Sequence, residues 1–231
     1  MTILAIDTSS EVLAVALARE GKIIAEYSSL SKNKHSKRLM PAIVQLLDNV
    51  DVKPKDLEKI VVAKGPGSYT GVRIGLSTAK TLAWTLKIPV VGISSLEALS
   101  LQVQGRDALI CPFFDARRNL VYTGLYDKNG QSIIADQNCL MTDWLDELAK
   151  LEQPIIFISP DLDLFKEVII DRLGTCAIFT SEGFNTTRAG LLALLGVNGS
   201  EEDVHQLVPS YLRLVEAEVN WLANQEEQSN E

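Results

Sequence analysis

The chain has 231 residues, of which 46% are hydrophobic and 23% charged, a composition typical of a folded globular protein. Its net charge of −8 argues against strong nucleic-acid binding by the chain alone, because such binding depends on basic side chains that neutralise phosphates. The apolar run at 3–6 stops at Asp7, which predicts a strand rather than a signal peptide, and no apolar run is long enough to cross a membrane. We therefore expect a cytoplasmic protein without a membrane anchor.

The first part of the chain carries strand and helix patterns in a definite order. Three apolar runs separated by turn residues predict an antiparallel meander. An amphipathic helix follows, and strands then alternate with helices, as in a sheet whose parallel strands are joined by helical crossovers. The expected elements are strands at 2–7, 11–18 and 22–30, a helix at 38–50, a strand at 59–64, a helix at 70–87, a strand at 88–93 and a helix at 94–104.

A similar pattern returns after Gly105. It predicts strands at 108–114, 119–127, 131–136, 154–158 and 176–179, and helices at 141–151, 162–172 and 185–196. We therefore expect an N-terminal lobe at 1–104 and a C-terminal lobe at 105–222, without a detectable sequence repeat between them. The polar, acidic residues 223–231 are expected to form a disordered tail.

One glycine-rich loop stands out between a predicted strand and a predicted helix. Residues 64–75 read Lys-Gly-Pro-Gly-Ser-Tyr-Thr-Gly-Val-Arg-Ile-Gly, and Thr70 is expected to cap the helix. Such loops often hold phosphate, but this spacing matches neither a Walker loop nor a dinucleotide-binding fingerprint. Small side chains recur at every fourth position of the helix, which favours close helix packing over phosphate binding: Gly71, Gly75, Ala79 and Ala83.

The same loop, taken with Ile-Leu-Ala-Ile-Asp-Thr-Ser at 3–9, resembles the TsaB (YeaZ) family. The resemblance is nearly continuous to about residue 100 and patchier beyond, in 115–122 and 209–213. It implies the two-lobed α/β architecture of the actin-like, sugar-kinase and Hsp70 (ASKHA) superfamily. The order βββαβα predicted for the first part of the chain is also the order found in that superfamily.

The resemblance also implies a function. TsaB proteins are non-catalytic partners of TsaD, which transfers a threonylcarbamoyl group to the adenosine beside the tRNA anticodon. The ATPase TsaE joins this pair, and TsaC makes the adenylate that TsaD uses. The chain is then expected to bind TsaD, to help dock TsaE, and to meet tRNA only within the complex.

The chain departs from the nucleotide-binding members of the superfamily. These members generally have glycines at the first hairpin, where this chain has Asp7, Thr8, Ser9 and Ser10. Glycines are also missing from 115–118, where a second phosphate hairpin is expected, and from 159–161, in place of an adenosine loop. We expect Asp7 to cap a turn and the chain to bind no nucleotide cofactor.

Metal and nucleophile chemistry have little support in the sequence. TsaD carries a His-x-x-x-His pair about where this chain reads Ser-Ser-Leu-Glu-Ala-Leu at 94–99, and the only histidines here are His35 and His205. There is no Gly-x-Ser-x-Gly elbow, and Cys111 is expected in the core. We predict no catalytic residue and no metal site. Two alternatives are an ATP-dependent kinase or transferase, and a metallopeptidase, acting on its own.

Cys111 is one of three cysteines, with Cys139 and Cys176. They are far apart and form no Cys-x-x-Cys pair. Each lies beside apolar residues, which predicts three buried thiols in a reducing compartment.

Two surfaces are predicted to bind partners. The first is an interface with TsaD, in which two helices of each protein form a four-helix bundle, and it would support weak homodimerisation when the partner is missing. Its expected residues are Met40, Val44, Leu47, Gly71, Gly75 and Ala79.

The second is a basic cluster that either contacts tRNA or is a solvated loop: Lys32, Lys34, Lys37 and Arg38. The pair Arg117 and Arg118 is a further possible contact, or simply surface.

Overall fold

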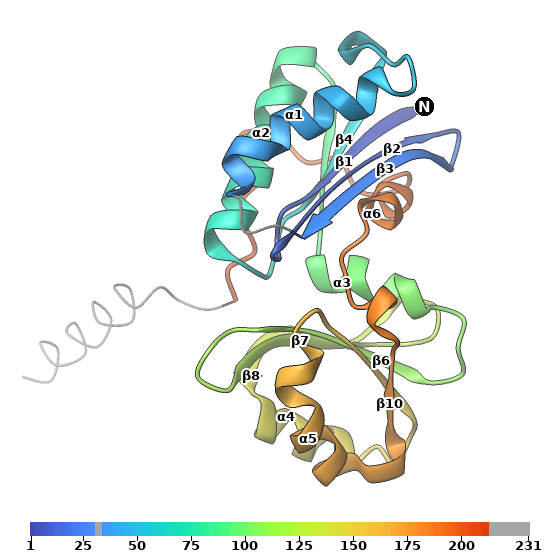
Figure 1. Cartoon of the computed structure of the whole chain (residues 1–231), viewed down its shortest axis with the longest axis vertical. Helices are drawn as coiled ribbons and strands as arrows, with labels where there is room; N and C mark the ends of the chain where they lie inside the picture. Colours follow the sequence, from blue (N-terminus) through green and yellow to red (C-terminus); the bar gives the residue numbers. More distant parts are fainter. Residues whose placement is uncertain (31–33, 213–231) are drawn as a thin grey trace, which may run out of the picture.

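The computed structural model describes residues 1–30 and 34–212, which form two lobes (Figure 1). Each lobe is built on a five-stranded sheet, with strand orders β3-β2-β1-β4-β5 and β10-β9-β6-β7-β8. In both sheets the first three strands of the lobe pair antiparallel and the last two add in parallel. The repeated order of elements that the sequence predicts is therefore a repeated sheet topology.

The first lobe contains every strand and helix expected there, with small shifts at the ends. Its elements are β1 (Thr2–Asp7), β2 (Val12–Arg19), β3 (Lys22–Leu30), α1 (His35–Asp48), β4 (Lys59–Ala63), α2 (Tyr69–Leu86), β5 (Val90–Ile93) and α3 (Ser95–Ser100). Helix α1 begins three residues before the expected start, where His35 Nε2 bonds the carbonyl of Ser10 at 2.9 Å. The side chain that caps α2 is Ser68, which accepts from the Gly71 N–H, and not Thr70 as expected.

The second lobe follows the same plan. Its elements are β6 (Leu109–Asp115), β7 (Leu120–Tyr126), β8 (Ser132–Leu140), α4 (Met141–Ala149), β9 (Ile155–Ile158), α5 (Leu162–Leu173), β10 (Ala177–Phe179) and α6 (Ala189–Leu195). Helix α6 starts four residues later than expected: a short 3-10 turn at Glu182–Phe184 comes first, and Arg188 before the helix is extended.

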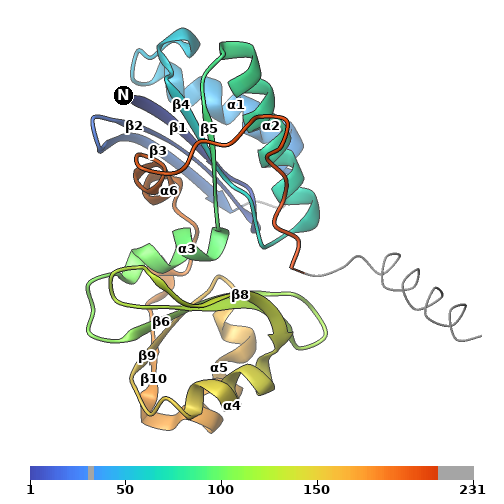
Figure 2. The same cartoon turned by 180° about the vertical axis from the view of Figure 1, so that it is seen from behind.

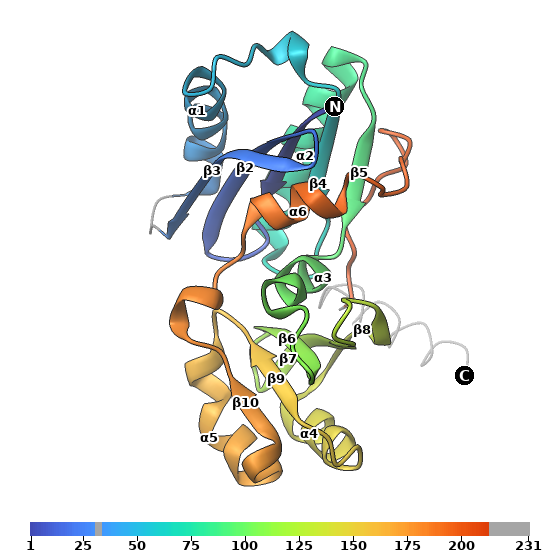
Figure 3. The same cartoon turned by 90° about the vertical axis from the view of Figure 1, so that its right-hand side faces the viewer.

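The last helix of each half covers the sheet of the other half (Figure 3). Helix α3 packs Leu96 and Leu99 against Ile110 and Ile156 of the second sheet. Helix α6 packs on β1, β2 and β3, and its Leu192 lies in a core with that sheet. The other faces are covered by α1 and α2 in the first lobe and by α4 and α5 in the second.

The chain stays with the first lobe after α6 (Figure 2). We call residues 200–211 the return segment. Its Glu202 pairs with Val90 of β5, its Leu207 is buried in the α1–α2 core, and the Ser210 N–H bonds the carbonyl of Lys64 at 2.7 Å. The expected C-terminal lobe at 105–222 is therefore wrong in this part, because 189–211 packs on the N-terminal sheet. The expected tail at 223–231 lies outside the described residues.

The three cysteines are free, and they differ in burial. Cys111 is fully buried and accepts a hydrogen bond from Trp144 Nε1 at 3.3 Å, and burial raises the pKa of its thiol to about 11. This confirms its expected place in the core. Cys139 and Cys176 are half-buried, so the expectation of three buried thiols is too strong. Within the described residues, no helix has the length and apolar character needed to span a membrane.

Candidate functional site

A cleft of about 790 Å³ lies between the lobes, where the two hairpins face each other. The first hairpin contributes Ser9 and Ser10, the second contributes Asp115 and Arg117, and Asp161 follows strand β9. The three segments in which glycines are missing therefore line one cleft.

The first hairpin has already used much of its hydrogen-bonding capacity. Asp7 Oδ1 accepts from both the N–H and the hydroxyl of Ser9, at 2.8 and 2.7 Å, which confirms its expected role as a turn cap. Thr8 Oγ1 donates to the carbonyl of Gly71, and the Ser68 N–H donates to the carbonyl of Ser9. Burial raises the pKa of Asp7, and its bonds to Ser9 partly oppose this effect. An amide that already bonds a carboxylate is not offered to a phosphate.

The second hairpin turns without glycine. Arg117, Arg118 and Asn119 all have positive φ, between 56° and 69°, a region that L-residues seldom occupy. Asp115 Oδ1 accepts from the N–H of Arg117, and Asp161 Oδ2 accepts from the N–H of Asp115 at 2.9 Å. Arg117 is exposed and its Nη1 lies 3.4 Å from Asp115, so its nearest partner lies within its own hairpin.

The cleft wall is negative near Asp161. Burial raises the pKa of Asp161, and the nearby carboxylates of Asp115 and Glu11 raise it further, while Arg117 opposes them. Carboxylates that already repel one another disfavour a triphosphate at this wall. The arrangement suits a neutral or cationic group better than an anion.

The stretch 94–99, where the resemblance led us to look for a histidine pair, lies at the junction of the lobes. Ser94 caps α3 and donates to Asp136 of β8, which also accepts from the hydroxyl of Tyr126. Glu97 lies beside this group, and burial together with the Asp136 charge raises its pKa. Among residues 1–30 and 34–212, no group of three His, Cys, Asp or Glu side chains has an arrangement that could hold a metal ion.

The residues expected to form the partner surface differ in exposure. Met40 and Val44 of α1 are 44% and 50% exposed, as predicted, but Leu47 is buried in the core. The small-residue stripe of α2 also faces inward: a Cβ added at Gly75 would lie 2.5 Å from Thr8 Oγ1, and one at Gly71 would collide with the carbonyl of Thr8.

Ala79, in the same stripe, is fully buried too. The stripe lets α2 approach β1 closely, so Leu47, Gly71, Gly75 and Ala79 do not form a surface groove. That part of the predicted interface is wrong.

The members of the predicted basic cluster differ in exposure and in hydrogen bonding. Lys34 and Lys37 are exposed, whereas Arg38 Nη2 donates to Tyr27 and Ser29 of β3, at 2.9 and 2.7 Å. Lys32 lies outside the described residues. Arg38 is therefore tied to the sheet, and the two lysines are the described members that a partner could reach.

Two features of α2 are missing from the sequence predictions. Arg73 lies over the ring of Tyr69, with its guanidinium 4.1 Å from that ring centre and 5.5 Å from the ring centre of Tyr211, and the two rings stack on each other. Trp84 is 66% exposed at the other end of the helix. Helical spacing could have indicated Trp84, because residues 77, 81 and 84 share the face opposite to the buried positions. The contact with Tyr211 joins segments far apart in sequence, and no local signal gives it.

The two matching sheets, the exchanged helices and the cleft between the lobes define an actin-like (ASKHA) protein. Comparison with solved structures agrees. The activator of the 2-hydroxyisocaproyl-CoA dehydratase from Clostridium difficile, solved with bound ADPNP, has a TM-score of 0.50 at 12% identity, covering 84% of this chain and 94% of that chain. At this identity the likeness shows the fold alone.

Closer similarity identifies the family. A family model described as "TsaD: tRNA N6-adenosine threonylcarbamoyltransferase" matches residues 22–221. The Bacillus subtilis "tRNA threonylcarbamoyladenosine biosynthesis protein TsaB" is 51% identical over 228 residues, covering 97% of this chain and 100% of that protein. The Escherichia coli protein of the same name is 34% identical over 134 residues, covering 56% of this chain and 58% of that protein.

A solved structure supports the same assignment. A Pseudomonas aeruginosa protein, described as having similarity to peptidase YeaZ, has a TM-score of 0.75 at 28% identity, covering 92% of this chain and 99% of that chain. The chain belongs to the TsaB (YeaZ) family.

Proposed function

We propose that this chain is a non-catalytic subunit that binds TsaD and supports threonylcarbamoyl transfer to tRNA. Its similarity to the B. subtilis TsaB extends over the full length of that protein, which is named for threonylcarbamoyladenosine biosynthesis. The match to a TsaD model supports a shared architecture with the enzyme and hence pairing between related lobes.

The observation that carries the proposal is the exposed apolar surface of α1. Met40 and Val44 are about half exposed, and α1 packs beside α2 on the same face of the first sheet. Neighbouring exposed apolar side chains on an outer helix are a feature of protein interaction sites. Two helices from a related lobe would cover them in a four-helix arrangement.

The test is to place a charge in this surface. We expect Val44→Glu to abolish or strongly weaken co-purification with tagged TsaD, because the carboxylate would be buried without a partner. The matched control is Leu164→Glu, at a residue that is 68% exposed on α5, a helix at the opposite end of the molecule from α1 (Figure 1). Both variants should keep the thermal transition of the parent. Equal loss of binding in both, or none in either, contradicts the proposed interface.

The alternative of an ATP-dependent kinase or transferase is tested at the cleft. The carboxylates of Asp115 and Asp161 and the closed first hairpin support weak nucleotide binding at most. We expect calorimetric titration of the isolated chain to show no saturation by ATP up to about 1 mM, and a dissociation constant in the low micromolar range would contradict this. The metallopeptidase alternative predicts one equivalent of zinc or iron in the purified chain, and we expect none.

The wider assembly is also part of the proposal. The chain would help TsaE dock on its pair with TsaD in the cytoplasm, while TsaC supplies the adenylate and tRNA binds the complex. TsaE should be retained on tagged TsaD more strongly when this chain is present. Retention that is the same without the chain would contradict the role in docking TsaE.

A further inference from the structure

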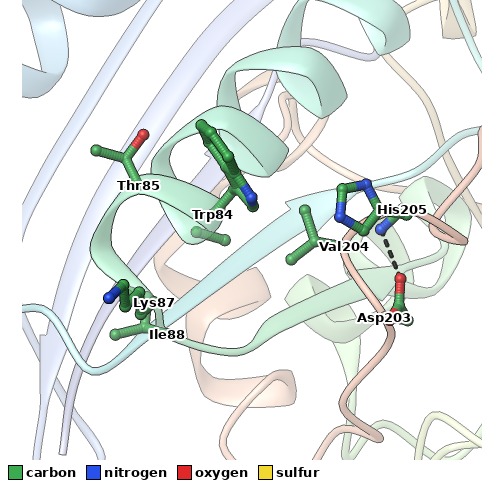
Figure 4. A pocket seen from close by; sticks show the side chains of 8 residues that line it. Trp84, Thr85, Lys87, Ile88, Asp203, Val204 and His205 are labelled. Carbon is green, nitrogen blue, oxygen red and sulfur yellow. Dashed lines mark hydrogen bonds between the residues drawn. The ribbon is translucent and has the colours of Figure 1, made fainter.

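An open groove lies where α2 ends and the return segment passes (Figure 4). Its volume is about 610 Å³, and Trp84 of α2 lies across it from Val204 and His205. The remaining lining residues are Ala83, Thr85, Lys87, Ile88 and Asp203. Trp84 is 66% exposed, so a large aromatic surface is left without cover.

The charge around α2 is unlike that of the rest of this acidic chain. Residues 59–96 contain five Lys or Arg side chains and no Asp or Glu; Lys59 and Lys64 pair with Glu201 and Glu202 of the return segment, which leaves Arg73, Lys80 and Lys87. Arg73 donates to the hydroxyl of Tyr211, and Lys80 donates to the carbonyl of Leu207 at 2.8 Å. These partners are neutral, so they satisfy hydrogen bonds without neutralising the two charges.

One segment of the chain has the complementary character. Residues 213–231 contain five Glu and one Arg, and 214–222 reads Leu-Val-Glu-Ala-Glu-Val-Asn-Trp-Leu, which combines acidic and apolar side chains. These residues lie outside the described part of the chain. They follow Leu212, directly after Tyr211, whose ring stacks on Tyr69 at the start of α2 at 5.4 Å.

The distances permit the segment to reach the groove. From Tyr69 to Trp84, α2 rises about 22 Å at 1.5 Å per residue. Ten extended residues after Leu212 span at most about 33–36 Å. Trp221 and Leu222 can therefore reach the groove from the point where the described chain ends.

We propose that residues 214–222 dock along α2 of their own chain, with Trp221 and Leu222 in the groove beside Trp84. The glutamates of the segment then lie near Arg73, Lys80 and Lys87, and the apolar side chains cover Trp84. The docked segment occupies part of the outer surface of α2 and competes there with any protein that binds this helix. That last consequence rests on the proposed function, whereas the docking itself does not.

Cross-linking in the full chain tests the docking. Thr85, an exposed groove residue, and Leu222 are both changed to Cys in a background in which Cys139 and Cys176 are Ser. A disulfide forms readily only when two Cα atoms come within about 7 Å of each other. The matched control pairs Leu222→Cys with Lys150→Cys, which is exposed at the end of α4 in the second lobe. Mild oxidation is followed by non-reducing electrophoresis and intact mass measurement.

We expect an intramolecular disulfide in the Thr85 pair at a yield several-fold above that of the control pair. The yield should fall at high salt, because the contact is partly electrostatic. Equal yields in the two pairs overturn the proposal. Covalent dimers linked through the Thr85 pair also overturn it, since they identify the occupant as a second copy. Neither result bears on TsaD binding, which the Val44→Glu variant tests separately.

Discussion

Replacing Gly75 with alanine tests whether the small-residue stripe of α2 is buried. The new Cβ would lie 2.5 Å from Thr8 Oγ1, closer than a real contact allows, and 3.6 Å from Ile6 Cγ2. Thr8 must then move, and its 2.7 Å hydrogen bond to the Gly71 carbonyl is lost. The rigid sheet behind it leaves little room for relaxation.

The free-energy change follows from three contributions. Overpacking of a core costs about 1–3 kcal/mol, and a buried hydroxyl and carbonyl left without partners cost about 1–3 kcal/mol. Alanine returns about 1 kcal/mol through its higher helix propensity. The central expectation for Gly75→Ala is a loss of about 3 kcal/mol in unfolding free energy, or a decrease in Tm of about 6–12 °C for a chain of this size.

The assay is thermal or denaturant unfolding with a double-mutant cycle. In a Thr8→Ala background the obstructing Oγ is gone, so Gly75→Ala should cost much less than in the parent. Ser77→Ala, on the exposed face of the same helix, should change stability by less than about 0.5 kcal/mol. A higher Tm for Gly75→Ala, or the same cost in both backgrounds, would refute the contact with Thr8. A folded Gly75→Leu variant that loses only TsaD binding would restore the stripe to the interface.

Three further predictions concern charge. Burial raises the folded-state pKa of Asp161, so its contribution to stability is present at low pH and is lost as pH rises. Asp161→Asn relieves the repulsion by Asp115 and should therefore raise Tm at pH 7 but have little effect at pH 3; a larger effect at pH 3 would contradict this sign. If Lys34 and Lys37 contact tRNA, changing both to Glu should reduce the salt slope of tRNA binding by the complex by about 0.9 per lost phosphate contact, and an unchanged slope favours a solvated loop. Lys59 is buried and donates to two carbonyls just beyond α6, so Lys59→Met should cost about 1–3 kcal/mol in chemical denaturation, and a neutral result would show that α6 is held without it.

Several features of this protein follow from local sequence. The periodicity of apolar side chains gives every strand and helix of both lobes to within a few residues, because the buried face of an element is set by its own spacing. The order of these elements also gives the repeated topology, since short connections bring successive strands together. At the cleft, the position of Asp7 at a strand end before a turn is enough to predict that its carboxylate caps the turn.

Only the tertiary structure shows which elements pack against one another. An apolar face does not specify the sheet it covers, so the exchange of α3 and α6 between lobes could not be read from either helix. The stripe at Gly71 and Gly75 fits a helix or a strand equally well, and only the position of Thr8 shows that it packs on β1. Arg38 likewise looks like a surface charge until β3 places Tyr27 and Ser29 beside it. Such contacts depend on distances between segments remote in sequence, which local spacing does not encode.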